Sequence, residues 1–320
     1  MVNSAITARG LHKAYGEHTV LDGIDLTVAE GTIFSLLGPN GAGKTTTVQI
    51  LTTLIGADDG QISVGGFDAR TEQKQVRELI GVTGQFAAVD ELLTGRENLQ
   101  MMGDLNHLPR SETRRLTAEL LERFDLLEAA DKQVSSYSGG MTRRLDLAMT
   151  LVGDPRVIFL DEPTTGLDPR SRRSIWDIIR NLVDERGVTV FLTTQYLEEA
   201  DHLADRIAVL DNGRIVAEGT AAELKRLIPG GHIRIDFAAQ AELTAARYAL
   251  GSTAHVLEGS DGLTLAVPSD GGVRSLRAVL DVLDTENIEA GGISVHTPNL
   301  DDVFLTLTGR DITTEQESVR

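Results

Sequence analysis

The chain of 320 residues carries 30 Lys and Arg against 48 Asp and Glu, a net charge of −18, with 41% hydrophobic residues and no cysteine. Its length allows one large domain and a smaller one, and its composition excludes a collagen-like or disordered chain. The absence of cysteine excludes disulfides, a thiol nucleophile and zinc–thiolate sites, and the acidic balance argues against nucleic acid as a ligand.

Predicted strands and helices alternate through the first 228 residues. Short β-branched runs at 32–38, 157–163, 188–194 and 207–213 alternate with helical patterns at 44–55 and 171–186. Near-continuous apolar strands between amphipathic helices are typical of a parallel sheet covered on both faces. We therefore expect an α/β domain over residues 1–228.

Three helical patterns without strands lie inside this domain. They cover residues 94–105, 110–124 and 139–152. We expect a helical insertion over about residues 86–154.

A Pro-Gly-Gly break after Ile228 predicts a domain boundary between residues 228 and 229. Beyond it the order is strand (232–237), helix (241–250), strand (255–259), strand (263–267), helix (273–283) and strand (292–296). This is the β-α-β-β-α-β order of ferredoxin-like domains. Residues 229–310 are expected to form a small α+β accessory domain that serves as a dimer contact or as a regulator, and residues 311–320 a flexible tail.

A last helical pattern at 300–308 places four apolar residues on one face, which favours packing or an interface: Leu300, Val303, Phe304 and Leu307. No apolar run reaches the roughly 18 residues of a membrane span, and the N-terminus lacks the apolar core of a signal peptide. We expect a cytoplasmic chain.

The first chemical motif joins the strand at 32–37 to the helix at 44–55. Gly38, Gly43, Lys44 and Thr45 fill the pattern G-x-x-x-x-G-K-[ST] in its strand–loop–helix setting. Such a loop surrounds phosphates with backbone N–H groups, while the lysine reaches the β- and γ-phosphates and the hydroxyl binds Mg²⁺. The sequence predicts a nucleoside triphosphate site.

The strand at 157–163 ends in Asp161 and Glu162. An aspartate at the end of a buried strand beside such a loop holds Mg²⁺ through water, and the next glutamate can polarise an attacking water. Strand alternation is expected to send the two carboxylates to different sides.

The segment from Tyr137 to Met141 reads YSGGM and opens the helical pattern at 139–152. A serine and two glycines at a helix N-terminus expose N–H groups that suit a phosphate. Alone, the segment is more often a plain helix cap, and its place before the strand at 157–163 is what makes it informative.

These motifs, in this order with Gln85, Asp168 and the strand at 188–194, resemble the ATP-binding subunits of ABC transporters over about residues 4–228. The segments TTQYLEEADHLADRIAVLDNGRIVAEGT and NLDDVFLTLTG are most similar to the daunorubicin/doxorubicin-resistance type, over nearly the full chain.

The resemblance implies a head-to-tail dimer in which each ATP lies between one phosphate loop and the partner's YSGGM segment. It implies that Tyr15 stacks on adenine, that Asp161 holds Mg²⁺ with Thr45 and Gln85, and that Glu162 is the catalytic base. The implied phosphate loop comprises Gly38, Pro39, Asn40, Gly41, Ala42, Gly43, Lys44, Thr45 and Thr46. The implied partner-site residues are Ser138, Gly139 and Gly140, with Asp168 at the dimer interface.

Two departures from the family pattern bear on mechanism. Tyr137 and Met141 replace the usual Leu and Gln but leave the Ser-Gly-Gly core intact, so phosphate recognition is expected to survive. Gln195 stands where most relatives have a histidine that contacts the γ-phosphate. Glutamine can donate a hydrogen bond but cannot become cationic, so slower hydrolysis is expected.

The leading hypothesis is the energy-coupling ATPase subunit of an efflux pump for amphipathic drugs, peripheral on the cytoplasmic membrane face. A separate multi-span permease would supply the path and contact the Gln85 loop. The alternative is an ABC ATPase acting on ribosomes or DNA. The single phosphate loop, the lack of sustained heptads and the acidic charge argue against that alternative.

Overall fold

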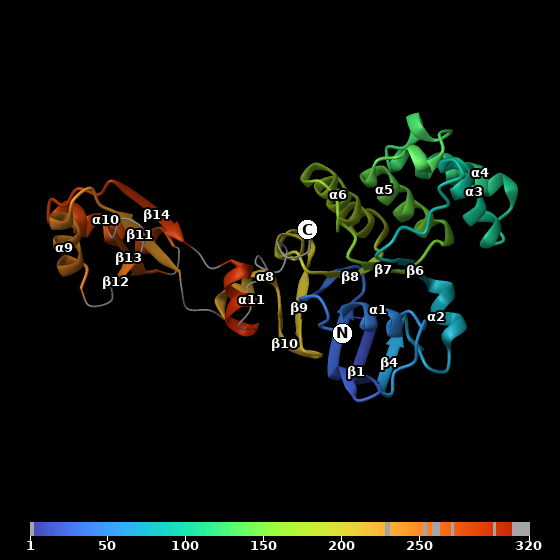
Figure 1. Cartoon of the computed structure of the whole chain (residues 1–320), viewed down its shortest axis with the longest axis horizontal. Helices are drawn as coiled ribbons and strands as arrows, with labels where there is room; N and C mark the ends of the chain where they lie inside the picture. The colour runs from blue at the N-terminus through green and yellow to red at the C-terminus, as the bar shows by residue number, and fades with distance from the viewer. Residues whose placement is uncertain are drawn as a thin grey trace. The chain divides into compact units, whose positions relative to one another are not determined.

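The computed structural model describes residues 3–227, 231–251, 255–257, 263–269, 272–296 and 299–308. The chain divides into two compact units, one within residues 1–221 and the other within residues 222–311 (Figure 1). The predicted boundary between residues 228 and 229, and the predicted tail at 311–320, lie outside the described residues.

A six-stranded sheet with the order β10-β9-β3-β8-β7-β6 forms the centre of the first unit. Neighbours from β9 to β6 run parallel, and β10 is antiparallel to β9. The strands are β3 (Ile33–Leu37), β6 (Ile80–Thr83), β7 (Val157–Asp161), β8 (Thr189–Thr194), β9 (Arg206–Asp211) and β10 (Arg214–Gly219). Because parallel strands end at one edge, the loops after β3, β7 and β8 meet there. The predicted α/β fold with parallel central strands is confirmed.

The second sheet, of order β2-β1-β4-β5, is antiparallel and was not anticipated from the sequence. It comprises β1 (Ser4–Tyr15), β2 (His18–Ala29), β4 (Asp59–Val64) and β5 (Phe67–Asp68). Its apolar face shares a core with the central sheet and with α1 (Lys44–Leu51), in which the Phe34 and Phe191 rings stack with centroids 5.5 Å apart. The helix predicted over 44–55 ends earlier than predicted, at Leu51, and Thr53 takes the left-handed conformation at φ 62°.

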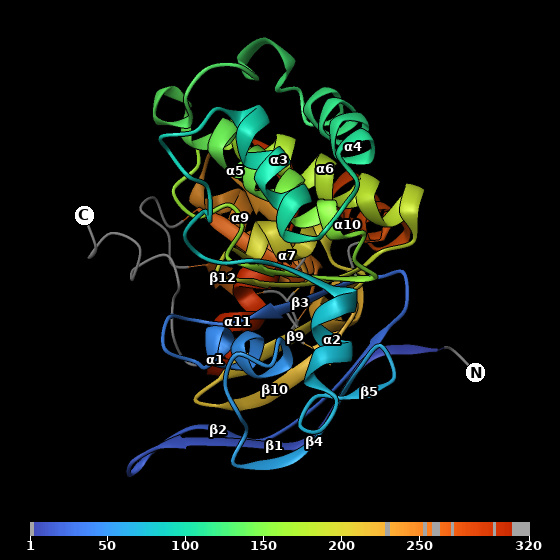
Figure 2. The same ribbon diagram turned by 90° about the vertical axis from the view of Figure 1, so that its right-hand side faces the viewer.

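Helices cover the other face of the central sheet (Figure 2). Helices α5 (Gly139–Thr150), α6 (Pro169–Arg186) and α7 (Leu197–Leu203) contact its strands, and α3 (Gly95–Leu105) and α4 (Arg110–Arg123) pack against α5 in the same core; α2 (Gln73–Leu79) precedes β6. All of residues 84–156 are described; they form helices and turns, with one isolated bridge between Thr94 and Gln133. Short 3₁₀ turns at Leu127–Ala129, Val134–Ser136 and Leu151–Gly153 join these helices.

The second unit contains an antiparallel sheet of order β12-β13-β11-β14. In chain order the elements are β11 (His232–Asp236), α9 (Gln240–Ala249), β12 (His255–Leu257), β13 (Thr264–Pro268), α10 (Val273–Thr285) and β14 (Gly292–His296). Helix α8 (Ala221–Arg226) precedes them and α11 (Leu300–Thr308) follows them. Ile233 and Ile235 of β11 pack in one core with Leu243 of α9 and Leu283 of α10. The predicted ferredoxin-like element order is confirmed.

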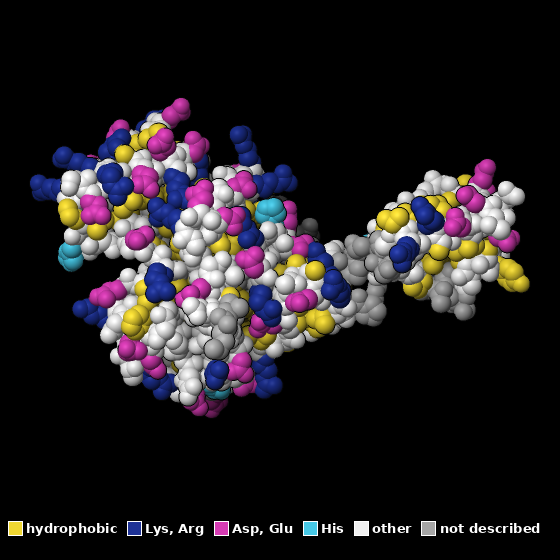
Figure 3. All heavy atoms as spheres, turned by 180° about the vertical axis from the view of Figure 1, so that it is seen from behind, with side chains coloured by type: hydrophobic (Ala, Val, Ile, Leu, Met, Phe, Trp, Pro, Cys, Tyr) yellow, Lys and Arg dark blue, Asp and Glu magenta, His cyan; other side chains and the backbone are white. Residues whose placement is uncertain are grey.

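The surface seen in Figure 3 mixes basic and acidic side chains over the first unit. Among the described residues, no helix is both long enough and apolar enough to cross a bilayer.

Candidate functional site

The loop between β3 and α1 has a backbone that only glycine fits at two positions. A Cβ atom on Gly38 would lie 2.4 Å from the carbonyl oxygen of Leu210. Gly43 has φ 109°, and a Cβ atom there would lie 2.6 Å from Cδ2 of Leu21. The loop therefore passes close to Leu210 and Leu21 before it leads into α1.

A cavity of about 350 Å³ opens beside this loop. Its lining comprises Asn40, Gly41, Gly43, Lys44, Thr45 and Thr46 of the loop and α1, His18 and Val20 of β2, and Gln85 and Glu162. The first turn of α1 holds no acidic side chain, so its N-terminal N–H groups present an uncompensated positive end. The lining suits an oxyanion such as a triphosphate.

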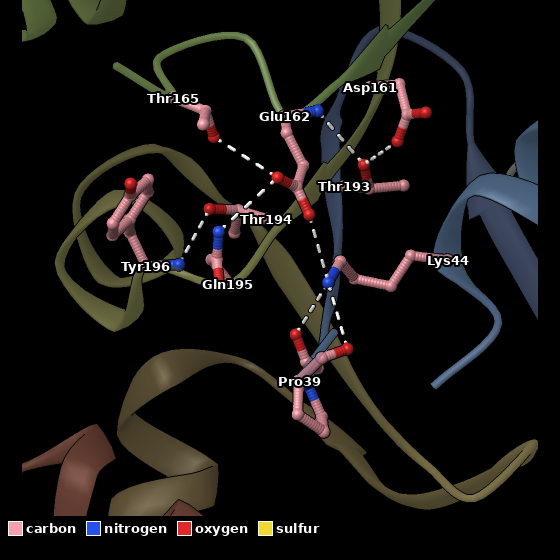
Figure 4. A network of polar contacts seen from close by, with 10 residues as sticks. Pro39, Lys44, Asp161, Glu162, Thr165, Thr193, Thr194, Gln195 and Tyr196 are labelled. Carbon is pink, nitrogen blue, oxygen red and sulfur yellow. Dashed lines mark hydrogen bonds and ion pairs between the residues drawn. The ribbon is translucent and has the colours of Figure 1, made fainter. Parts of the chain in front are cut away.

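The Lys44 side chain is buried and held by three acceptors (Figure 4). Its Nζ donates to the carbonyl oxygens of Gly38 at 2.8 Å and Pro39 at 3.1 Å. It also forms an ion pair with Oε1 of Glu162 at 3.1 Å. The cation thus stands between the loop and the end of β7.

Glu162 points away from Asp161 because its backbone turns. Strand β7 ends at Asp161, and Glu162 takes the left-handed conformation at φ 49°. Its N–H donates to both the carbonyl and the hydroxyl oxygen of Thr193, each at 3.1 Å. The two carboxylates diverge as expected, but the cause is this turned residue and not simple strand alternation.

The two acidic side chains have separate hydrogen-bond partners (Figure 4). Glu162 Oε2 accepts from the Thr165 hydroxyl at 3.2 Å and from Gln195 Nε2 at 3.5 Å. Asp161 Oδ1 accepts from the Thr193 hydroxyl at 2.5 Å. Sequence reasoning missed both threonines, although Thr193 lies in the predicted strand at 188–194 and pairs with Asp161 across the parallel ladder.

A buried carboxyl group lies behind these residues. Glu199 of α7 is fully buried, and its Oε1 accepts from the Thr164 hydroxyl at 2.8 Å and from Trp176 Nε1 at 2.9 Å. Burial raises the pKa of Glu199, while hydrogen bonds from its neighbours act in the opposite direction. Glu199 therefore ties the segment after Glu162 to α6 and α7, a role that the sequence did not reveal.

Tyr15 is half exposed at the end of β1 and lies outside the cavity lining. The Lys13 ammonium stands 5.3 Å from its ring centroid. Its cross-strand partner is His18, which lines the cavity. Tyr15 therefore pairs with a residue that lines the cavity but does not itself line it.

The predicted partner-site residues also lie outside this cavity. Ser138 caps α5 by accepting from Met141 N at 3.3 Å, and Gly139 and Gly140 form its first turn. Asp168 caps α6, and the hydrogen bond from the Ser171 side chain holds the pKa of Asp168 below its ordinary value. Ser138 and Asp168 are both exposed.

Three side chains near the loop offer the hard oxygen donors that Mg²⁺ prefers. They are the hydroxyl of Thr45, the amide of Gln85 and the carboxylate of Asp161. Thr45 and Gln85 line the cavity and are exposed, while Asp161 lies beside Glu162 at the buried end of β7. This donor set fits a magnesium ion bound with a nucleotide.

Comparison with known proteins points to one family at the levels of family profile, full-length relatives and solved structure. Residues 21–165 match the family profile described as ABC transporter. A daunorubicin resistance ATP-binding protein of Streptomyces coeruleorubidus is 50% identical over 311 residues, 97% of this chain and 98% of that relative. A doxorubicin resistance ATP-binding protein of Mycobacterium tuberculosis is 45% identical over 312 residues, which are 95% of this chain and 93% of that relative.

A solved dimeric ATP-binding cassette, in a post-hydrolysis state bound to ADP and Pi, is similar in structure. It has a TM-score of 0.62 and 26% identity, and the match covers 67% of this chain and 98% of that chain.

Replacing Lys44 by alanine is expected to weaken ATP binding by about 10- to 100-fold, because a charged hydrogen-bond donor to phosphate is lost. The dissociation constant is measured by isothermal titration calorimetry. Lys74→Ala is the matched control, because Lys74 is 86% exposed on α2. Equal affinities of the Lys44 and Lys74 variants would contradict the assignment.

Replacing Glu199 by glutamine is expected to change how stability depends on pH. Since the folded-state pKa of Glu199 is raised, the stabilisation by its neutral form is complete below the unfolded-state pKa of about 4.3 and is lost as pH rises through the folded-state pKa. Glutamine cannot ionise. The free energy of unfolding of Glu199→Gln, relative to wild type, should therefore increase between pH 5 and pH 8.

Urea unfolding followed by circular dichroism measures this difference. Glu198→Gln, at the exposed neighbouring position, should show no such trend. A relative stability of Glu199→Gln that stays constant with pH would show that the carboxyl does not titrate in this interval.

Proposed function

The chain belongs to the ABC transporter family, and from that premise we propose that it is the ATP-hydrolysing subunit of an exporter for amphipathic drugs or antibiotics. One observation carries the chemistry: the buried contact of Lys44 with Glu162 beside a glycine-rich phosphate loop. The substrate class is supported by the resistance proteins to which the chain is similar along nearly its whole length.

ATP binding is the task of the loop and of Lys44. Backbone N–H groups of the loop and of the first turn of α1 donate hydrogen bonds to the phosphate oxygens. The Lys44 ammonium, now shared between two carbonyls and Glu162, turns to the β- and γ-phosphates. A bound triphosphate thus competes with Glu162 for the same cation.

Hydrolysis is the task of Glu162. When Lys44 contacts phosphate, the carboxylate is left with its Thr165 and Gln195 hydrogen bonds and can accept a proton from an attacking water. Gln195 orients this carboxylate and donates toward the γ-phosphate without supplying a positive charge. We expect it to position the reaction rather than stabilise developing charge.

We propose that Mg²⁺ is held by Thr45, Gln85 and Asp161. A bound ion would supply positive charge that offsets the negative charge of the phosphates. The hydrogen bond from Thr193 orients the carboxylate of Asp161 for this role.

A second copy of the chain is proposed to complete each ATP site. Ser138, Gly139 and Gly140 lie at the start of α5 and outside the cavity of their own chain. A helix start of this kind suits a γ-phosphate bound by another subunit. Asp168, exposed at the start of α6, would lie across the same interface.

We propose a separate permease with several membrane spans as the partner that carries the drug, contacted through the segment around Gln85. The chain would then be peripheral on the cytoplasmic face of the membrane. Residues 1–228 would serve as the ATPase domain, with a helical insertion over about 86–154, and residues 229–310 as an accessory domain for dimerisation or regulation. No nucleic acid partner is expected from the net charge of −18.

Replacing Glu162 by glutamine is expected to preserve ATP binding and to lower turnover by at least about 100-fold, because the proton acceptor is lost while the amide keeps its shape. The variant should also accumulate as an ATP-bound dimer. Phosphate release and size-exclusion chromatography with ATP measure the two effects. Glu122→Gln, at an exposed position of α4, is the control, and undiminished turnover of Glu162→Gln would refute the role.

Export is tested in cells that contain the chain together with the proposed permease. Cells with the wild-type pair are expected to accumulate less daunorubicin than cells with Lys44→Ala, because export needs ATP. The drug remaining in washed cells is measured. Equal accumulation in both strains would contradict a drug-export role while leaving the ATPase assignment to the turnover assay.

A further inference from the structure

A buried arginine joins three segments around the site. Arg143, in the second turn of α5, is 6% exposed. Its guanidinium donates to the carbonyl oxygens of Pro163 at 2.7 Å and Gly84 at 2.8 Å, and more weakly to that of Asp161 at 3.4 Å. The arginine therefore contacts the backbone on both sides of Glu162 and the residue before Gln85.

Asp146 lies one turn further along α5 and completes the arrangement. It is 3% exposed, and its Oδ2 forms an ion pair with Nη1 of Arg143 at 3.1 Å. Its Oδ1 accepts from the N–H of Ala88 at 3.0 Å. Together the two side chains hold both ends of the segment 84–88, in which Gln85 lies.

The chemistry of the guanidinium explains why an arginine stands here. Its planar fork directs several N–H groups at once, so one side chain can bond three carbonyls and a carboxylate. Burial acts against both charges, lowering the pKa of Arg143 and raising that of Asp146. A buried charge is tolerated only with a partner, so each residue depends on the other.

The simplest interpretation is that the pair only satisfies buried carbonyls, as Arg144 does nearby. Arg144, the next residue, donates to the carbonyl oxygens of Phe124 and Asp125 at 3.1 and 3.2 Å, and these contacts stay within the helical region. The contacts of Arg143 instead reach the chain around Glu162. No contact of Arg143 or Asp146 given above touches the phosphate loop.

We propose that Arg143 and Asp146 are positioning residues that fix the backbone around Glu162 relative to the Gln85 segment and to α5. We call this pair the ionic bracket. The proposal rests on the proposed ATPase function. Since the bracket sets where the Glu162 carboxylate stands but does not touch the phosphate loop, its loss affects hydrolysis and leaves the binding of ATP in the absence of Mg²⁺ intact.

The test compares Arg143→Gln with Arg144→Gln in the full chain. Turnover with Mg²⁺ and ATP is measured by phosphate release, and ATP affinity without Mg²⁺ by isothermal titration calorimetry. Arg143→Gln is expected to lower kcat at least about tenfold, with a dissociation constant for ATP within about twofold of wild type. Arg144→Gln is expected to match wild type in both. A purely structural role would lower binding and turnover together.

Two further variants cover the case in which Arg143→Gln does not fold. Arg143→Lys keeps the charge but not the fork, so it is expected to lower kcat at least threefold with unchanged ATP affinity. Asp146→Asn keeps the acceptor for Ala88 but removes the counter-charge, and its effect should not add to that of Arg143→Gln in the double variant.

The outcomes separate the two proposals. Wild-type turnover in Arg143→Gln or Arg143→Lys, or a parallel loss of ATP affinity, would overturn the bracket while the proposed function stands. A wild-type chain without ATPase activity would overturn both.

Discussion

The buried contact between Lys44 and Glu162 lies at the centre of the site, and the architecture of the first unit is what allows this contact to form. Two charges shielded from water need nearby partners, and each group has them: two loop carbonyls for the lysine, and Thr165 and Gln195 for the glutamate. These partners come from the loops after β3, β7 and β8, so the contact can form only where adjacent parallel strands end together. The left-handed backbone at Glu162 directs its carboxylate to that point.

The covering of the sheet keeps this contact rigid. One core joins the central sheet to α1 and to the antiparallel sheet, and a second joins it to the helices. Strands β3, β7 and β8 are buried at every residue, so their ends have little freedom to move separately. The segments around Gln85 and after Glu162 are linked to the helices through the side chains of Arg143 and Glu199.

Local pattern was sufficient to predict the elements whose signal lies within their own residues. The apolar strands, the glycine-rich loop and the ferredoxin-like order of the second unit all follow from periodicity and from turn residues. The antiparallel sheet was missed because β1 has no clean alternation of polar and apolar residues, and in β2 the alternation is limited to the five residues from Ile24 to Val28. Arg143 was missed for another reason: its contact with Pro163 lies 20 residues away in the chain, and inside a helical pattern an arginine is ordinarily exposed. Such roles depend on tertiary contacts that no local pattern records.

Trp176 is the only tryptophan of the chain, and its position has a practical consequence. Its indole N–H donates to Glu199, and its ring lies 5.0 Å from that of His202 on α7. Ultraviolet emission from this single indole therefore reports on the carboxyl group behind Glu162 and on α7, which follows Gln195. The protein thus carries an intrinsic optical probe at the back of its site, and a rearrangement of Glu199 or of α7 would change the intensity or wavelength of that emission without any attached dye.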